Sequence, residues 1–241
     1  MTTAARDLEL ALAKRWGLVA GMDEVGRGAL AGPVAVGVAV IGQDAPPVPE
    51  GLTDSKALSA RRREALVAPI HSWVRDCAVG YASPQDIDRW GIIAALRLAG
   101  RRALAEVASR AVMPGGVLLD GCHDWLSAPE DLFGDEDGPE DPFGIALPVH
   151  MQVKADLSCA VVAAASVIAK VARDRLMSEA DDPGYGWASN KGYGSAAHAR
   201  AIGRLGVSDF VARGRCRRAP QSRARRGGRV ASTPRPGMMG P

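Results

Sequence analysis

Short apolar runs alternate along this chain with longer amphipathic segments, and this alternation limits the folds open to it. Five segments have the composition of strands: Leu18–Asp23, Pro33–Ile41, Val74–Tyr81, Val117–Asp120 and Pro148–Val153. Four have the periodicity of helices: Ser59–Trp73, Ile92–Ala111, Leu157–Met177 and Ala196–Leu205. Strands that alternate with helices in a chain of 241 residues favour an α/β domain.

The composition excludes several other classes of protein. Hydrophobic residues make up 47% of the chain and charged residues 24%, which is typical of a globular protein and not of a disordered one. The longest apolar run, Cys159–Ala169, is interrupted by Ser166 and is too short to cross a bilayer. Charged residues interrupt Met1–Trp16, which is unlike a secretory signal. The 4 cysteines are far apart and form no CxxC pair, as in proteins with reduced thiols. We therefore expect a cytoplasmic protein without a membrane segment.

Two segments carry the extremes of charge. The stretch Glu130–Asp141 contains only acidic charges, and we expect it to form a flexible acidic loop at about residues 127–146. Residues 213–241 are rich in Arg, Gly and Pro and contain no acid, which predicts a disordered tail. The remaining part, residues 1–212, is predicted to be the folded domain. Because the charge is concentrated in these two segments, the net charge of +3 does not by itself indicate nucleic-acid binding.

The glycine-rich stretch Gly21–Pro33 (GMDEVGRGALAGP) follows a predicted strand, as in dinucleotide-binding proteins. The spacing of its glycines is one residue too long for that motif, and Pro33 stands where the phosphate-binding helix should already have begun. Asp23 and Glu24 would also repel a pyrophosphate. A dinucleotide-dependent oxidoreductase therefore remains a remote alternative.

Carboxylates at the ends of two predicted strands indicate a different chemistry. Asp23 and Glu24 close one strand and Asp120 closes another, so the three can converge and bind a hard ion such as Mg²⁺ or Mn²⁺. Each acid taken alone is more often a solvated strand end or turn residue. Asp156 directly precedes the helix Leu157–Met177, where it is either an N-cap, a fourth ligand, or both.

Three further residues suit contacts with nucleic acid. Arg27 lies inside the glycine turn, where the backbone can approach a ligand closely, and Lys56 lies in the polar loop Thr53–Lys56. Tyr193 is flanked by glycines in Asn190–Gly194, which exposes its ring for stacking. Each of them alone is also compatible with an ordinary surface position.

Taken together, five blocks of sequence closely resemble the bacterial type 2 ribonucleases H, the ribonuclease HII family. The blocks are GMDEVGRGALAGPV, LTDSKALSARRRE, LLDG, VKADLSCAVVAAASVIAKVARD and NKGYGSAAH, in family order over about residues 18–206. The resemblance implies a ribonuclease H-like fold, which is a mixed β-sheet flanked by helices with a small helical C-terminal part. It also implies that Asp23, Glu24, Asp120 and Asp156 bind Mg²⁺ or Mn²⁺ and are catalytic.

The resemblance further implies a substrate and a reaction. The family hydrolyses the RNA strand of RNA/DNA hybrids and cuts 5′ to ribonucleotides embedded in duplex DNA, by two-metal-ion catalysis that leaves 3′-OH and 5′-phosphate ends. By analogy, the turn Gly26–Arg27–Gly28 contacts the ribose 2′-OH, Tyr193 stacks on the next sugar and Lys56 binds backbone phosphate. His198 matches a family histidine that could assist the site. The expected enzyme is a monomeric, metal-dependent endoribonuclease.

The chain departs from the family pattern after Gly206–Asp209. The family usually continues with a His-Arg…Ser-Phe block, whereas this chain reads Phe210–Arg215 and then the arginine-rich tail. A shifted reading frame near codon 210 would produce such an ending, and resequencing the gene would test that hypothesis. Besides the remote oxidoreductase, two alternatives remain: a non-catalytic RNA/DNA-binding relative with a damaged C-terminus, and another nuclease of the same superfold, such as a junction resolvase.

Overall fold

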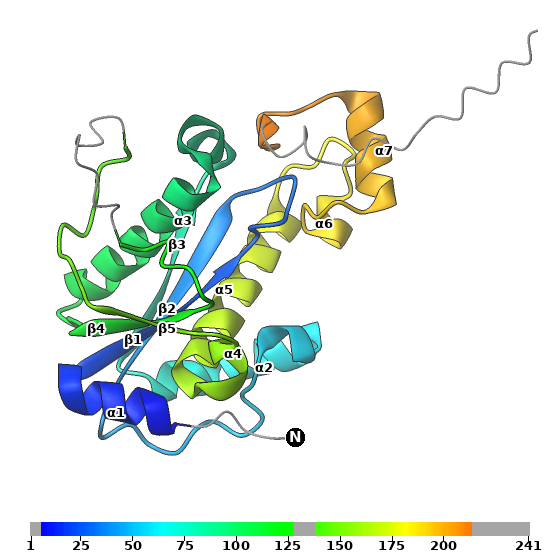
Figure 1. The fold of residues 1–241 in the computed structure, drawn as a ribbon. Helices are drawn as coiled ribbons and strands as arrows, with labels where there is room; N and C mark the ends of the chain where they lie inside the picture. The colour runs from blue at the N-terminus through cyan, green and yellow to red at the C-terminus, as the bar shows by residue number, and fades with distance from the viewer. Residues whose placement is uncertain (1–5, 128–137, 214–241) are drawn as a thin grey trace, which may run out of the picture.

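The computed structural model describes residues 6–127 and 138–213. Its centre is a five-stranded mixed sheet in the order β3-β2-β1-β4-β5 (Figure 1). The strands are β1 (Leu18–Val25), β2 (Val34–Gly42), β3 (Asp76–Ala82), β4 (Gly116–Asp120) and β5 (Val149–Gln152). The first three pair antiparallel, while β4 pairs parallel with both β1 and β5. The predicted tail, apart from Arg213, and residues 128–137 of the predicted acidic loop lie outside the described residues.

Helices cover both faces of the sheet. They are α1 (Asp7–Trp16), the short 3-10 helix η1 (Ser55–Ala57), α2 (Ala60–Trp73), α3 (Pro84–Ser109), α4 (Ala155–Ser158), α5 (Ala160–Glu179), α6 (Trp187–Asn190) and α7 (Ala196–Leu205). One buried cluster joins α1, α2 and α5 to the sheet, and a second joins α3 to the opposite face. The predicted α/β class with a mixed sheet between helices is therefore confirmed. In the described part of the chain, no helix is long and apolar enough to cross a membrane.

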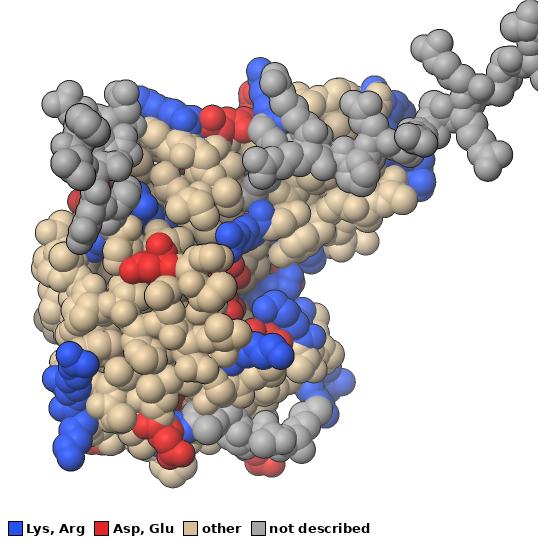
Figure 2. Space-filling model, viewed as in Figure 1, with Lys and Arg blue, Asp and Glu red and all other residues tan. Residues whose placement is uncertain are grey.

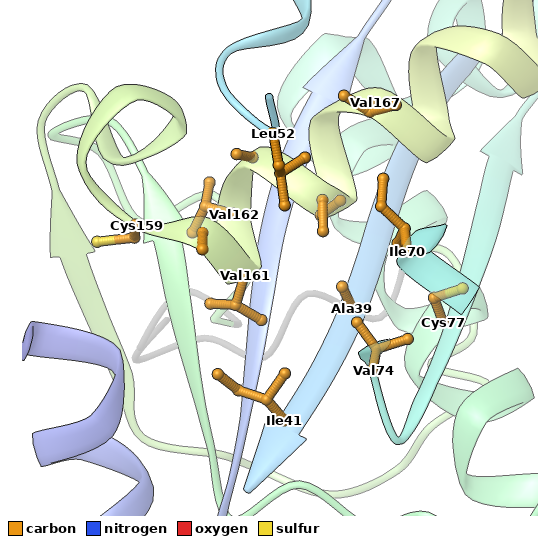
Figure 3. Packing of buried hydrophobic residues seen from close by; sticks show 14 of the residues in the cluster. Ala39, Ile41, Leu52, Ile70, Val74, Cys77, Cys159, Val161, Val162 and Val167 are labelled. Carbon is orange, nitrogen blue, oxygen red and sulfur yellow. The ribbon is translucent and has the colours of Figure 1, made fainter. Parts of the chain in front are cut away.

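The helix α5 lies unusually close to the sheet. A Cβ atom on Gly21 of β1 would stand 2.6 Å from the backbone carbon of Val161, and one on Gly37 of β2 would stand 2.2 Å from the carbonyl oxygen of Ala165. Both strands therefore need glycine at these positions. The close approach lets the small apolar side chains of α5 pack directly on β2 (Figure 3).

Three differences from the sequence-based expectations bear on the position of the acidic residues. The backbone is extended at Cys159, so the helix expected over 157–177 is divided into α4 and α5. Asp156 lies inside α4, whose N-cap residue is Lys154, and the N-cap interpretation of Asp156 is therefore wrong. The strand β1 continues to Val25, which places Asp23 and Glu24 inside the strand and not at its close.

The small helical C-terminal part, expected from the family resemblance, consists of α6, α7 and the residues around them. Its own buried cluster includes Tyr185 and Trp187, whose rings stack with centroids 5.1 Å apart. This part also joins the loop after β1, because the N–H of Gly32 donates to the carbonyl of Phe210 at 2.8 Å.

Candidate active site

The structure brings the four predicted carboxylates to one end of the sheet. In the parallel pair of β1 and β4, Met22 stands opposite Leu119, so Asp23 and Asp120 follow at the next position of neighbouring strands. The backbone N–H of Ala155 donates to Asp120 Oδ1 at 2.7 Å, and this bond fixes the short helix α4, which carries Asp156, against the end of β4. The parallel pairing of β1 and β4 thus accounts for the proximity of Asp23 and Asp120, and the role of the four acids as metal ligands stays a prediction.

Burial and mutual repulsion raise the pKa of three of these carboxylates. Burial raises the pKa of Asp23 to about 7, and the negative charges of Glu24 and Asp120 add to the effect. The pKa of Glu24 is raised by burial and by Asp120, while that of Asp120 is raised by burial and by Asp156. The neighbouring protein groups therefore do not fully compensate the negative charge of these carboxylates.

Two cationic side chains border the carboxylates. Lys56 Nζ lies 3.2 Å from Asp156 Oδ2, and Arg27 Nη1 lies 3.3 Å from Glu24 Oε1. The position of Lys56 is set locally, since Asp54 accepts the N–H of Lys56. The Lys56 side chain is 73% exposed, so its ammonium group also faces solvent. Lys and Arg side chains surround a hollow in which acidic groups are visible near the middle of the face in Figure 2.

The predicted substrate-binding elements lie beside the carboxylates on β1. The turn Gly26–Gly28 directly follows β1, and Gly26 has a positive φ of 89°, a conformation that favours glycine. A Cβ on Gly28 would meet no atom within 4 Å, so the backbone there is open to a ligand. The loop that carries Tyr193 reaches the same region, because Gly192 accepts the backbone N–H groups of Leu30 and Ala31 at 2.8 and 3.1 Å.

The model of the family described as Ribonuclease HII matches residues 20–219. The chain belongs to the ribonuclease HII family. It is 44% identical over 195 residues to a ribonuclease HII of Streptomyces avermitilis, covering 80% of this chain and 74% of that protein. It is 48% identical over 189 residues to a ribonuclease HII of Streptomyces griseus, covering 76% and 71%. The predicted membership and the predicted enzyme class, an endoribonuclease that acts on RNA/DNA hybrids, are confirmed.

Solved structures confirm the ribonuclease H-like fold. The structure of Bst-RNase HIII in complex with Mn²⁺ superimposes with a TM-score of 0.58 at 24% identity, and the match covers 80% of this ribonuclease HII and 64% of that chain. At this level of identity the likeness concerns the fold alone.

The carboxylates of this ribonuclease HII have the chemistry of a divalent-metal site. Within residues 6–127 and 138–213, no three His, Cys, Asp or Glu side chains already stand in the geometry of a bound ion. The donor atoms are nevertheless all carboxylate oxygens, which Mg²⁺ and Mn²⁺ prefer. A divalent cation would also relieve the repulsion that raises the pKa of Asp23, Glu24 and Asp120. The residues present therefore fit the ion that the family uses.

His198 of this ribonuclease HII is buried in the C-terminal part and does not lie among the carboxylates. Trp187 Nε1 donates to His198 Nε2 at 3.3 Å, so the other ring nitrogen, Nδ1, carries the proton and donates to the carbonyl of Tyr193 at 2.9 Å. The histidine thus supports the backbone of the Tyr193 loop from inside.

Sequence reasoning missed one residue of this ribonuclease HII that contacts both predicted substrate-binding elements. The side chain of Arg173 is fully buried beneath the two loops, although the residue lies in the more polar last turns of the expected helix Leu157–Met177. The available signal was helical spacing, because Arg173 lies seven residues after the buried Ser166 and four before the buried Met177, on the same helix face.

Proposed function

We propose that Asp23, Glu24, Asp120 and Asp156 hold Mg²⁺ or Mn²⁺ and that this enzyme cuts 5′ to a ribonucleotide embedded in duplex DNA. The observation that carries the proposal is the convergence of these acids at one end of the sheet, where burial and repulsion raise the pKa of three of them. When bound, divalent ions supply the positive charge that activates a water molecule and stabilises the leaving 3′-oxygen. The products would carry 3′-OH and 5′-phosphate ends.

The residues around the acids would bind and orient the substrate. Lys56 is exposed and cationic, so it is suited to a backbone phosphate close to Asp156. The open backbone at Gly28 and the neighbouring Arg27 would contact the ribose, whose 2′-OH can both donate and accept a hydrogen bond. Tyr193 would stack on the adjacent sugar. Such a site distinguishes RNA from DNA because only ribose has this hydroxyl group.

We also propose that residues 1–212 form the catalytic domain and that the enzyme works as a monomer in the cytoplasm on RNA/DNA hybrids and on duplex DNA with embedded ribonucleotides. The described cysteines, Cys77, Cys122 and Cys159, are free thiols, which suits a reducing compartment. The arginines of residues 213–241 would add binding to phosphates that weakens steeply with salt.

Cleavage of a DNA duplex that contains one ribonucleotide tests this function directly. With Mg²⁺ or Mn²⁺ we expect a single nick 5′ to the ribonucleotide, no cutting of the all-DNA duplex, and loss of the nick in Asp23→Asn. Asp7→Asn is the matched control, because Asp7 is an exposed acid on α1. Binding of the duplex without a nick in either metal would instead support the non-catalytic alternative.

A further inference from the structure

The side chain of Arg173 is a buried cation whose hydrogen-bond partners are backbone carbonyls. It has no solvent exposure, and its guanidinium donates to Pro33 O at 2.8 Å, to Lys191 O at 2.9 Å and to Ala31 O at 3.0 Å. Among the described residues, no carboxylate forms an ion pair with it, and burial lowers its pKa. Because burying a charge without a counter-ion is costly, this arrangement is better explained by the geometry it imposes than by stability.

The three carbonyls belong to two loops that are far apart in the sequence. Ala31 and Pro33 follow the turn Gly26–Gly28, while Lys191 precedes Tyr193. A single planar guanidinium therefore spans both loops, and its five donors fix their separation and orientation together.

The guanidinium also contacts both groups that we propose to bind sugars of the substrate. Its Cζ atom lies 5.5 Å from the centroid of the Tyr193 ring. On the other side, a Cβ on Gly26 would stand 2.3 Å from Arg173 Nε, so the turn rests directly on the side chain. The same ring lies 5.3 Å from Lys170 Nζ, one turn earlier in α5. Two cations of α5 thus lie beside the ring, and one of them, Arg173, also lies against the turn.

We propose that Arg173 is a positioning residue that fixes the turn Gly26–Gly28 and the ring of Tyr193 relative to each other. It would make recognition of the ribose 2′-OH and stacking on the neighbouring sugar occur in one register of the substrate strand. The inference rests on the proposed function and adds a residue that itself touches no substrate. Lysine cannot replace the arginine, because an ammonium group is a compact donor that lacks the planar fork.

The test is steady-state cleavage of the single-ribonucleotide duplex by Arg173→Lys and Arg173→Gln. We expect kcat to fall about 10- to 100-fold in either variant, as for a misplaced substrate, with KM changed only a few-fold because phosphate contacts remain. Arg175→Lys is the matched control and should keep wild-type kcat, since Arg175 is exposed on the same helix and pairs with Glu64. Arg173→Gln removes the buried charge and provides a folded variant if Arg173→Lys is unstable.

A double-mutant cycle separates positioning from a merely structural role. If Arg173 acts through Tyr193, then Arg173→Lys in the Tyr193→Ala background should lower kcat by much less than it does in the wild type. Full independence of the two effects, unchanged kcat in both variants, or a loss that equals the loss of folded protein would overturn the inference. Failure of the wild-type enzyme to cut the duplex would instead refute the proposed function, and the two failures are therefore distinguishable.

Discussion

The carboxylate of Glu9 accepts a hydrogen bond at 2.8 Å from the backbone N–H of Val161, in the first turn of α5. The residue that precedes α5, Cys159, provides no side-chain cap, so the capping group comes from α1, 152 residues earlier in the chain. Glu9 is fully buried, and its only ion-pair partner in the described part of the chain is Arg6. Helix α1 therefore caps the N-terminus of α5, the helix that also carries Arg173.

The stability of the protein should depend on the protonation of Glu9. Burial raises its pKa from 4.5 to about 7, so the folded protein retains a proton that the unfolded chain releases between these values. The contribution of Glu9 to stability is therefore complete below its unfolded pKa and is lost as the pH rises through about 7. In Glu9→Gln, the free energy of unfolding relative to wild type should rise by up to about 3 kcal/mol across this window. Urea unfolding of both proteins near pH 5 and near pH 8 measures this difference in the free energy of unfolding. The same difference at both pH values would contradict the prediction.

Replacing Asp23 should raise the stability of the metal-free protein and lower its activity. Asp23→Asn removes a buried charge that Glu24 and Asp120 repel, so the metal-free variant should unfold at a higher temperature than the wild type. Its kcat should fall by at least about 100-fold, as when a group that stabilises charge is lost. Mg²⁺ should raise the Tm of the wild type much more than that of the variant. Thermal unfolding with and without Mg²⁺ checks both points; an equal rise in Tm would show that Asp23 does not bind the ion.

Lys56 should matter for the binding of substrate more than for the chemical step. In Lys56→Met, KM should rise several-fold, and the slope of log affinity against log salt should fall by about 1, as expected for one lost phosphate contact. Lys14→Met, which changes an exposed lysine on α1, should leave the slope unchanged. Binding isotherms at several salt concentrations give the slope, and identical slopes for both variants would refute the phosphate contact.

The close packing of α5 on the sheet should make Gly37 intolerant of any side chain. Gly37→Ala places a Cβ 2.2 Å from the carbonyl oxygen of Ala165, and the forced separation should cost about 1–3 kcal/mol of stability. Gly203→Ala in α7 is the control, since its Cβ would meet no atom within 4 Å and should stabilise the helix by about 0.5–1 kcal/mol. Urea unfolding of both variants tests the contrast, and a neutral Gly37→Ala would show that α5 can move away.

Most elements with a pattern of their own could be predicted from the sequence. The expected helix Ala196–Leu205 has the bounds of α7, and the bounds of the five expected strands lie within two residues of those of β1 to β5. The break at Cys159 could not be found, because the bonds around it come from Asp120 and Glu9 in distant parts of the chain. The sequence predicted a helix only from Ile92, whereas α3 begins at Pro84. The two parts of α3 meet at Gly91, whose φ of 80° is not helical.

The candidate site was predictable to the extent that it depends on strand ends. Asp120 ends a strand and Asp23 lies two residues before the end of its neighbour, so the parallel pairing brings them together. For Asp156 the local pattern left a helix cap and a fourth ligand open, and the family resemblance favoured the ligand that we propose. The contacts of Arg173 could not be predicted from the sequence. The backbone carbonyl groups that it binds come together only when two loops that are distant in the sequence meet in the folded protein.

The hydrogen bond from Gly32 to Phe210, and that from Ala212 to Leu30 at 3.2 Å, have a consequence for the order in which the molecule is completed during translation. The sheet and α5 consist of residues that leave the ribosome before residue 180, whereas the loop after β1 receives these partners only when residues 210–212 emerge. A nascent chain of about 180 residues thus already contains all four carboxylates and Arg173, while the backbone partners that Phe210 and Ala212 give to the loop after β1 are still to be synthesised. The discrimination between sugars that we propose for these loops would then be acquired last.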